Sequence, residues 1–222
     1  MLKSKKTVTL LGGGEFNRDT LVSFMKFSSR LCVADGAADR ALDEGFLPDL
    51  VIGDFDSISQ RALKEIPQER QLRISEQDST DFEKCINHIE APLIYGVGFT
   101  GARIDHELAV YHVLVRYPGK RVVVIGSEDI CLHAPRSLRL SLEPGTRVSL
   151  FPMAAVTGRS TGLRWPIEGL KFAPDRQIGT SNEAVEAEIT LEFDGPGMLL
   201  ILPRAVLPEL ERGLRHAEPH GG

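Results

Sequence analysis

The stretch Pro48-Asp-Leu-Val-Ile-Gly-Asp54-Phe-Asp56-Ser57 decides how the first half of this chain is interpreted. A short apolar run ends at a glycine, and two aspartates separated by one residue follow at once. Alternate residues of an extended segment point to the same side, so both carboxylates can face one ion. Mg²⁺ is usually held by one or two carboxylates, while substrate phosphates complete its shell. The stretch therefore predicts a site that handles a polyphosphate.

Short apolar runs alternate with segments of helical spacing on both sides of this stretch. Apolar spacing predicts helices, and Thr80 and Glu83 are typical of a helix N-terminus with a capping box. The alternation indicates an α/β N-terminal domain with a mainly parallel sheet and helices on its faces. The expected strands lie near residues 7–11, 31–34, 50–52, 72–74, 93–97 and 122–125, and the expected helices near 21–28, 37–42, 61–66, 80–88 and 104–115.

The pattern changes after about residue 127. Period-two alternation and short apolar runs separated by glycine and proline predict strands near 138–142, 148–151, 187–193 and 198–202. A helix is expected only near the end, from Pro208. This half is typical of an all-β sandwich. We therefore expect two domains, an α/β domain at 1–130 and a β-sandwich domain at 131–222.

Composition narrows the function classes. The 222 residues suffice for one large domain or two small ones, and 42% hydrophobic with 26% charged residues is typical of a globular protein. A net charge of −5 argues against a nucleic-acid partner. Cys32, Cys85 and Cys131 all lie in apolar runs, which indicates buried thiols in a reducing compartment. Because no stretch has the pattern of a signal peptide or a membrane span, we expect a cytoplasmic protein without a membrane partner.

Further polar clusters follow other predicted strands. Each has a structural explanation as a turn, a helix cap or a solvated surface group, and a lone Asp-x-Asp is most often a turn. Capping explains Thr80 and part of Asp81, but it does not explain Asp78. Because open α/β sheets bind ligands at the carboxyl ends of their strands, the shared position favours function. The clusters are Gly12-Gly13-Gly14, Asp35-Gly36, Asp78-Ser-Thr80-Asp81 with Lys84, and Gly98-Phe-Thr-Gly101-Ala-Arg103-Ile-Asp105-His106.

The β half offers two polar clusters of its own. Gly162-Leu-Arg-Trp165 contains the only tryptophan, which is either a core residue or a stacking platform for a flat ring. Gly179-Thr-Ser181-Asn182-Glu183 is the other cluster.

Taken in order along nearly the whole chain, these motifs resemble the thiamine pyrophosphokinase family. Ala37 and Ala102 stand where that family usually has glycine. The resemblance implies an ATP-binding α/β domain, a thiamine-binding β domain and a homodimer with active sites at the interface. It also implies transfer of the diphosphoryl unit of ATP to the thiamine hydroxyl, with release of AMP.

The resemblance also assigns roles to residues. Asp54, Asp56 and Asp81 would hold Mg²⁺ and, with Asp105, would form the catalytic set. The ATP-binding residues would be Gly13, Asp35, Gly36, Asp78, Thr80, Lys84, Gly101 and Arg103, with Lys84 and Arg103 meeting phosphates. The thiamine-binding residues would be Asp105, His106, Trp165, Ser181 and Asn182, with Trp165 stacking on the pyrimidine ring and Ser181 contributed by the partner subunit.

Some alternatives stay open at this point. Either Asp81 or Asp105 can accept the proton of the thiamine hydroxyl. Another Mg²⁺-dependent nucleotide transferase or hydrolase would share the Asp-x-Asp pair, although an aspartyl phosphatase would need threonine or valine where Ile58 stands. A non-catalytic thiamine or nucleotide sensor is a third reading, which the four retained carboxylates oppose.

Overall fold

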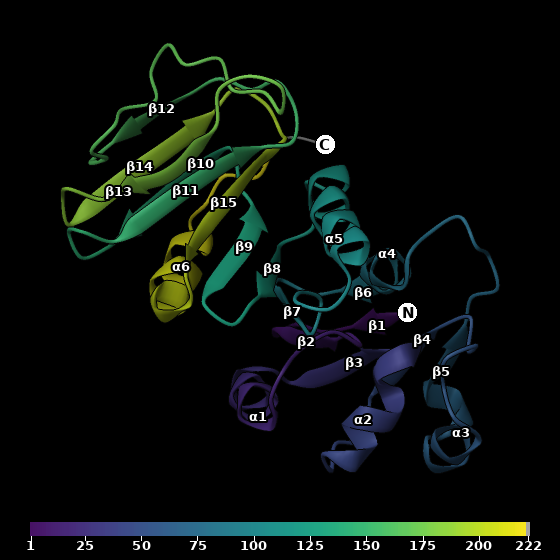
Figure 1. The fold of residues 1–222 in the computed structure, drawn as a ribbon. Coiled ribbons are helices and arrows are strands. Elements are labelled where there is room, and N and C mark those ends of the chain that lie inside the picture. The colour runs from purple at the N-terminus through teal and green to yellow at the C-terminus, as the bar shows by residue number, and fades with distance from the viewer. Residues whose placement is uncertain (221–222) are drawn as a thin grey trace. The chain divides into compact units, whose positions relative to one another are not determined.

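The computed structural model describes residues 1–220, and the chain divides into two compact units (Figure 1). Unit 1 comprises Met1–Val113 and Val122–Gly126, and unit 2 comprises Leu114–Arg121 and the chain from Ser127 onward. The sequence boundary expected between residues 130 and 131 falls inside strand β9 (Asp129–His133). The units part earlier, between Gly126 and Ser127.

A parallel sheet forms the centre of unit 1. Leu10 lies in register between Cys32 of one neighbouring strand and Gly96 of the other. All residues of β2, β4, β7 and β8 are buried, as expected for parallel strands that are covered on both faces. The strand order is β8 (Val122–Ile125), β7 (Ile94–Val97), β2 (Val8–Leu11), β3 (Arg30–Ala34), β4 (Leu50–Gly53) and β5 (Gln71–Arg73).

Helices cover both faces of this sheet. In Figure 1, α4 (Asp81–Asn87) and α5 (Ile104–Arg116) lie on one side, and α1 (Arg18–Phe27) and α2 (Ala38–Asp43) lie on the other. Helix α3 (Gln60–Glu65) packs against α2. The expected helices are therefore confirmed. The remaining elements of unit 1 are the 3₁₀ turns η1 (Asp35–Ala37) and η2 (Gln68–Arg70) and a small parallel pair, β1 (Leu2–Lys3) with β6 (Ile89–Glu90).

The start of α4 follows the predicted capping. Thr80 precedes the helix in an extended conformation, and its side chain accepts a hydrogen bond from the Glu83 amide at 3.3 Å. Phe82, Cys85 and Ile86 are buried against the sheet. The cap and this apolar face fix the direction in which Asp81 and Lys84 leave the helix.

Helix α5 has apolar residues on an exposed face as well as on its buried face. The buried residues of this helix include Val110, Val113 and Leu114. Ile104 and Leu108 belong to a different stripe, the one whose spacing predicted this helix, and they are 78% and 57% exposed. Tyr111 and Val115, which complete that stripe, are only partly buried. The apolar spacing correctly predicted the helix, but the structure buries another of its faces.

Unit 2 contains two groups of antiparallel strands. One has the order β13 (Gly179–Glu183), β11 (Arg147–Pro152), β15 (Met198–Pro203) and β9, and the other β10 (Ser137–Ser141), β14 (Glu188–Phe193) and β12 (Gly158–Thr161). In β10, Leu138 and Leu140 are buried, and the residues between them are exposed. After a 3₁₀ turn, η3 (Arg204–Val206), helix α6 (Leu207–Leu214) packs on β10. Strands β9, β12 and β13 were not predicted.

Two sequence expectations concern single features. Cys32, Cys85 and Cys131 are buried, and they form no disulfide within residues 1–220. Within the same range, the helices are all too short or too polar to cross a membrane.

The parallel arrangement decides where the predicted motifs meet. Gly12, Asp35, Asp54 and Gly98 each come directly after one of these parallel strands, namely β2, β3, β4 and β7. The carboxyl ends of parallel strands meet at one edge of the sheet, where α/β proteins bind ligands. The fold thus brings four separate motifs to one edge.

Candidate active site

A cavity of about 570 Å³ opens at this edge of unit 1. Its volume lies within the usual range for a small-molecule site. Nine of the predicted site residues line it: Gly13, Gly36, Asp54, Asp56, Thr80, Asp81, Lys84, Arg103 and His106. Gln77, Phe82 and Phe99 are also in its wall.

The turn after β4 has an unusual backbone. Phe55, between the two aspartates, has a φ of 68°, which is a left-handed conformation that bulky residues rarely adopt. The Phe55 amide donates to Asp35 Oδ2 at 2.8 Å, and the Gly36 amide donates to Asp35 Oδ1 at 2.8 Å. Asp35 is only 1% exposed. This buried carboxylate therefore holds the turn by accepting hydrogen bonds from two backbone amides.

Close packing at this point explains the glycine before the pair. A Cβ built on Gly53 would lie 2.2 Å from the Asp35 carboxyl carbon. Any side chain at position 53 would therefore displace Asp35 and the turn that it supports. The sequence showed this glycine as the end of an apolar run, but not the packing reason for it.

Three carboxylates converge above the sheet edge. Oxygen atoms of Asp35, Asp54 and Asp56 all lie within 4.8 Å of one another. The resemblance implied that Asp54, Asp56 and Asp81 hold the metal. In the structure, the carboxylates that could share one ion are those of Asp35, Asp54 and Asp56, so Asp35 takes the place of Asp81. Hard carboxylate oxygens are the ligands that Mg²⁺ prefers, so the donor set fits that ion.

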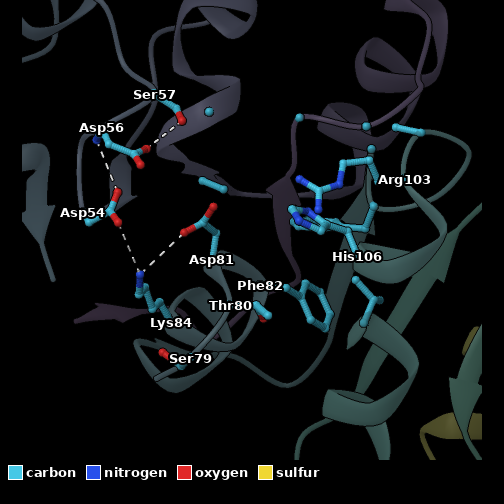
Figure 2. A pocket seen from close by; sticks show the side chains of 18 of the residues that line it. Asp54, Asp56, Ser57, Ser79, Thr80, Asp81, Phe82, Lys84, Arg103 and His106 are labelled. Atoms are coloured by element: carbon cyan, nitrogen blue, oxygen red, sulfur yellow. Dashed lines mark hydrogen bonds and ion pairs between the residues drawn. The ribbon is translucent and has the colours of Figure 1, made fainter. Parts of the chain in front are cut away.

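Lys84 links this cluster to α4. Its Nζ lies 3.9 Å from Asp54 Oδ2 and 3.7 Å from Asp81 Oδ1, and its side chain is only 3% exposed (Figure 2). Burying an ammonium group is costly unless negative charge surrounds it. The two carboxylates supply that charge and hold the cation at the cavity wall.

The pKa values of the acidic groups respond to this crowding. Burial raises the pKa of Asp35, and the Asp81 carboxylate adds to the shift, although amide hydrogen bonds oppose it. Burial also raises the pKa of Asp81, against the attraction of Lys84. The pKa of Asp54 is lowered, first by a hydrogen bond from Gln77 and then by the Asp56 amide. The buried Asp35 and Asp81 are therefore harder to ionise than usual, whereas Asp54 is easier to ionise.

Basic groups face the cluster from the start of α5. Figure 2 shows Arg103 and His106 on the opposite side of the cavity from Asp54, Asp56 and Lys84. Arg103 donates to both oxygens of Asp105, with Nε at 3.1 Å and Nη2 at 2.5 Å. This pairing lowers the pKa of Asp105 to about 2. Asp105 is not among the residues that line the cavity.

The segment before α4 contains a residue that sequence reasoning missed. Glu76 accepts the amides of Asp78 and Ser79 at 2.8 and 3.1 Å, as well as the Ser79 hydroxyl. Gln77 Nε2 donates to Asp54 Oδ2 at 2.8 Å. Asp78 itself is exposed and does not line the cavity. The signal for Glu76 was its place beside the predicted acidic motif.

The predicted residues of unit 2 form a small cluster of their own. The Trp165 amide donates to Asn182 Oδ1 at 3.2 Å, and Asn182 Nδ2 donates to the Trp165 carbonyl at 2.7 Å. Ser181 has a left-handed φ of 61°, and its amide donates to Ser149 Oγ at 2.9 Å. Trp165 is 57% exposed, so it is not a core residue. The structure therefore brings Trp165, Ser181 and Asn182 together on β13 and the loop beside it.

The fold and the cavity define a class of protein: an α/β protein whose sheet edge combines a carboxylate cluster with lysine and arginine, as suits phosphoryl transfer. Residues 21–125 match the family model described as thiamin pyrophosphokinase, catalytic domain. Residues 132–197 match that of the thiamin pyrophosphokinase vitamin B1 binding domain. The chain belongs to the thiamine pyrophosphokinase family.

Individual relatives agree with this assignment. Thiamine pyrophosphokinase 1 of Arabidopsis thaliana is 31% identical over 200 residues, covering 74% of each chain. The solved structure of yeast thiamin pyrophosphokinase has a TM-score of 0.74 at 17% identity and covers 90% of this chain and 87% of its own. Thiamin pyrophosphokinase from Candida albicans has a TM-score of 0.73 at 20% identity, covering 91% and 93%. The two structures show that the fold is shared.

Proposed function

We propose that this protein is a Mg²⁺-dependent thiamine diphosphokinase, which transfers the diphosphoryl group of ATP to the hydroxyl of thiamine and releases AMP. ATP-dependent diphosphoryl transfer to thiamine is the known reaction of the family. The observation that carries the proposal is the cavity in which the carboxylate cluster and Lys84 face Arg103 and His106. Phosphoryl transfer depends on positioning and on neutralising charge, and these groups can do both.

The proposed metal site centres on Asp54 and Asp56, with Asp35 oxygens within 4.8 Å of theirs and Asp81 facing them from α4. Mg²⁺ bound there would neutralise phosphate oxygens and stabilise the charge that develops on the AMP leaving group. Asp35 uses both oxygens to hold the turn, so we assign it to supporting the site more than to ATP itself.

The remaining roles in unit 1 concern the nucleotide. Lys84 and Arg103 are proposed to meet phosphate oxygens as fixed positive charges. The ATP contacts are otherwise assigned to Gly13, Gly36, Asp78, Thr80 and Gly101. The exposed position of Asp78 makes it the weakest member of this set.

Thiamine binding is proposed for His106, Asp105, Trp165, Ser181 and Asn182. Support for Trp165 comes from its exposed indole ring, and the Asn182 side chain holds the Trp165 backbone through two hydrogen bonds. An exposed aromatic face is suited to stacking on a flat ring. Unit 2 would then be the thiamine-binding domain, with its two groups of strands packed as a sandwich.

For the proton of the thiamine hydroxyl, we propose Asp81 as the acceptor. Asp105 has both oxygens engaged by Arg103. Asp81 accepts no hydrogen bond from the residues that the structure describes, and it lies in the cavity wall. A base needs a free oxygen within reach of the proton that it takes.

Two asparagine variants test this choice. Asp81→Asn should lower kcat by about 10²-fold or more, because general base catalysis typically contributes that much. Asp105→Asn should change kcat much less and act mainly through KM. Steady-state kinetics with saturating ATP compare the two, and wild-type kcat in both variants would remove carboxylate base catalysis from the mechanism.

We further propose a cytoplasmic homodimer with active sites at the interface. The exposed Ile104 and Leu108 on α5, close to Arg103 and His106, support a protein interface beside the cavity. Apolar side chains that remain exposed next to one another are typical of such surfaces.

The decisive experiment is incubation with ATP, Mg²⁺ and thiamine, followed by chromatography of the nucleotides. AMP and thiamine diphosphate formed in equal amounts, only when thiamine is present, would support the proposed reaction. ADP or free phosphate would instead indicate another nucleotide transferase or a hydrolase. Binding of thiamine and ATP without turnover would indicate a sensor. Chelation with EDTA should abolish turnover, and added Mg²⁺ should restore it.

A further inference from the structure

The cavity wall formed by Gly13 and Gly14 lies in a loop that has few side chains to hold it. On one side, backbone hydrogen bonds attach it to the end of β7 and the loop that follows. The Gly12 amide donates to Val97 O at 2.8 Å, the Gly14 amide to Gly98 O at 2.7 Å and the Glu15 amide to Thr100 O at 3.1 Å. These bonds fix one edge of the wall.

The glycines of this wall are required by close packing. A Cβ on Gly12 would lie 2.6 Å from Gly98 O, and one on Gly14 would lie 2.7 Å from the same oxygen. Contacts below 3.0 Å force the neighbouring backbone to move. The loop therefore cannot carry anchoring side chains at these positions, and its other edge must be held from outside.

Arg40 of α2 provides that second anchor. Its Nη1 donates to the Gly14 carbonyl at 3.3 Å, and its Nη2 donates to the Phe16 carbonyl. The guanidinium carbon lies 3.7 Å from the centre of the Phe16 ring, which is the geometry of a cation–π contact. Arg40 does not line the cavity.

The partners of Arg40 are unusual for a surface arginine. Within residues 1–220 it forms no ion pair, whereas Arg61 on α3 contacts Asp39, Asp43 and Glu65. Its planar fork is used for two carbonyls and one ring, a combination that lysine cannot reproduce.

Of the two residues of this loop that line the cavity, Gly13 has an amide that is free within residues 1–220. The Gly13 amide donates to no acceptor among the described residues, although the amides of Gly12 and Gly14 do. Gly13 lines the cavity and is exposed. Free backbone N–H groups in a glycine loop bind phosphate oxygens.

We infer that Arg40 is a positioning residue for the nucleotide: by holding the Gly14 and Phe16 carbonyls away from the cavity, it keeps the Gly13 amide directed at a phosphate oxygen. The inference rests on the proposed function for the identity of the ligand. Arg40 acts through the loop and not by touching the substrate.

The test compares Arg40→Lys and Arg40→Ala with Arg61→Lys, a matched surface substitution in the same unit. KM for ATP should rise about tenfold in Arg40→Ala, equivalent to ~1.4 kcal/mol, and less in Arg40→Lys. KM for thiamine and kcat should change less than about twofold, since the anchored group meets only the nucleotide. Arg61→Lys should match the wild type. Millimolar methylguanidine should partly restore the KM for ATP of Arg40→Ala, because the Arg40 site is exposed.

Hydrogen exchange gives a readout that does not depend on turnover. Amides of residues 12–16 should exchange faster in Arg40→Lys than in the wild type, while those of Arg61→Lys should be unchanged. If Arg40→Ala keeps the wild-type KM for ATP and the wild-type exchange, the inference is wrong. Equal increases in both KM values, with a lower melting temperature, would show a merely structural role and would also overturn it. A wild-type protein that forms no AMP from ATP and thiamine would refute the proposed function, while the exchange comparison would still decide whether Arg40 holds the loop.

Discussion

Asp56 is an exposed carboxylate, and its importance is not visible from its own contacts. Its Oδ1 accepts the neighbouring Ser57 hydroxyl at 2.7 Å. Its position follows from the left-handed Phe55 and from the buried Asp35, which comes after the adjacent strand β3 and accepts the Phe55 amide. At the scale of residues, backbone conformation therefore positions the carboxylates of the proposed metal site, and their negative charge would bind the ion.

Replacing Asp56 with asparagine should remove one charged metal ligand without disturbing the fold. We expect kcat/KM to fall roughly 10³-fold or more, because metal stabilisation of transferring phosphates contributes several kcal/mol. The Mg²⁺ concentration for half-maximal activity should rise as well. Enzyme assays at increasing Mg²⁺ measure both quantities.

Asp43→Asn is the matched control for this variant. Asp43 is also an exposed aspartate of unit 1, but it contacts Arg61 at 2.7 Å and lies outside the cavity. It should retain wild-type activity and Mg²⁺ dependence. Equal behaviour of the two variants would exclude Asp56 from the metal site.

Single residues also show what the sequence alone could reveal about the site. A shared place in the cavity wall was predictable for Asp54, Asp56, Asp81, Lys84 and Arg103, because each belongs to a polar motif that follows a strand or begins a helix. The contacts of Gln77 and Arg40 were not, because their partners lie far along the chain and only folding brings them near.

At the scale of elements, hydrophobic spacing predicted the buried parallel strands and the helices well. It failed for β12 and β13, whose sequences Gly-Arg-Ser-Thr and Gly-Thr-Ser-Asn-Glu have no apolar alternation. These strands form through backbone pairing with β14 and β11. Pairing partners far along the chain leave little trace in the local pattern.

The exposed stripe of α5 leads to a prediction about assembly. Leu108→Lys should convert a dimer to a monomer, because it places a charge in an apolar contact. Light scattering coupled to size exclusion measures the mass directly. Leu47→Lys is the control, since Leu47 is similarly exposed, at 49%, but lies in a loop outside α5.

Two outcomes would oppose this interface. A wild-type protein that is monomeric at micromolar concentration would remove the dimer altogether. A dimer that survives Leu108→Lys unchanged would place the interface elsewhere on the molecule.

At the scale of the whole molecule, stability should depend on pH through His133. This side chain is 8% exposed, and its Nε2 accepts the Gly197 amide at 2.9 Å, which requires a neutral ring. Burial lowers the pKa of His133 to about 4, and the nearby His220 imidazole adds to the shift. In the unfolded chain the pKa returns to about 6.5.

The direction of the effect follows from these two values. Between pH 6.5 and 4 the unfolded chain binds a proton that the folded chain does not, so the free energy of unfolding falls as the pH falls. The total loss from His133 is about 3 kcal/mol, and it is complete below about pH 4. Urea unfolding at several pH values should show it.

His133→Gln should make this part of the pH profile flatter, because glutamine does not titrate. His216→Gln, which changes an exposed histidine, should leave the wild-type profile unchanged. Parallel profiles for wild type and His133→Gln would show that another group controls acid stability.

The overall organisation was partly predictable for a physical reason. The change from helical to alternating periodicity correctly indicated helices in the first half and mostly strands in the second. The point where the units part was harder to place, because residues 114–121 belong with unit 2 although the strand after them, β8, belongs with unit 1. Local periodicity contains no information about such an exchange.

The left-handed Phe55 has a consequence for how this protein would evolve under different selection pressures. A bulky residue in this conformation costs on the order of 1–3 kcal/mol, whereas glycine or asparagine adopts it more easily. A library varied at position 55 and selected for heat resistance should therefore become enriched in glycine and asparagine. The same library selected for growth on thiamine should retain residues that keep the Asp54 and Asp56 carboxylates rigidly directed, since a glycine hinge loosens them. Sequencing both pools would show whether thermal robustness and turnover demand different residues at this one position.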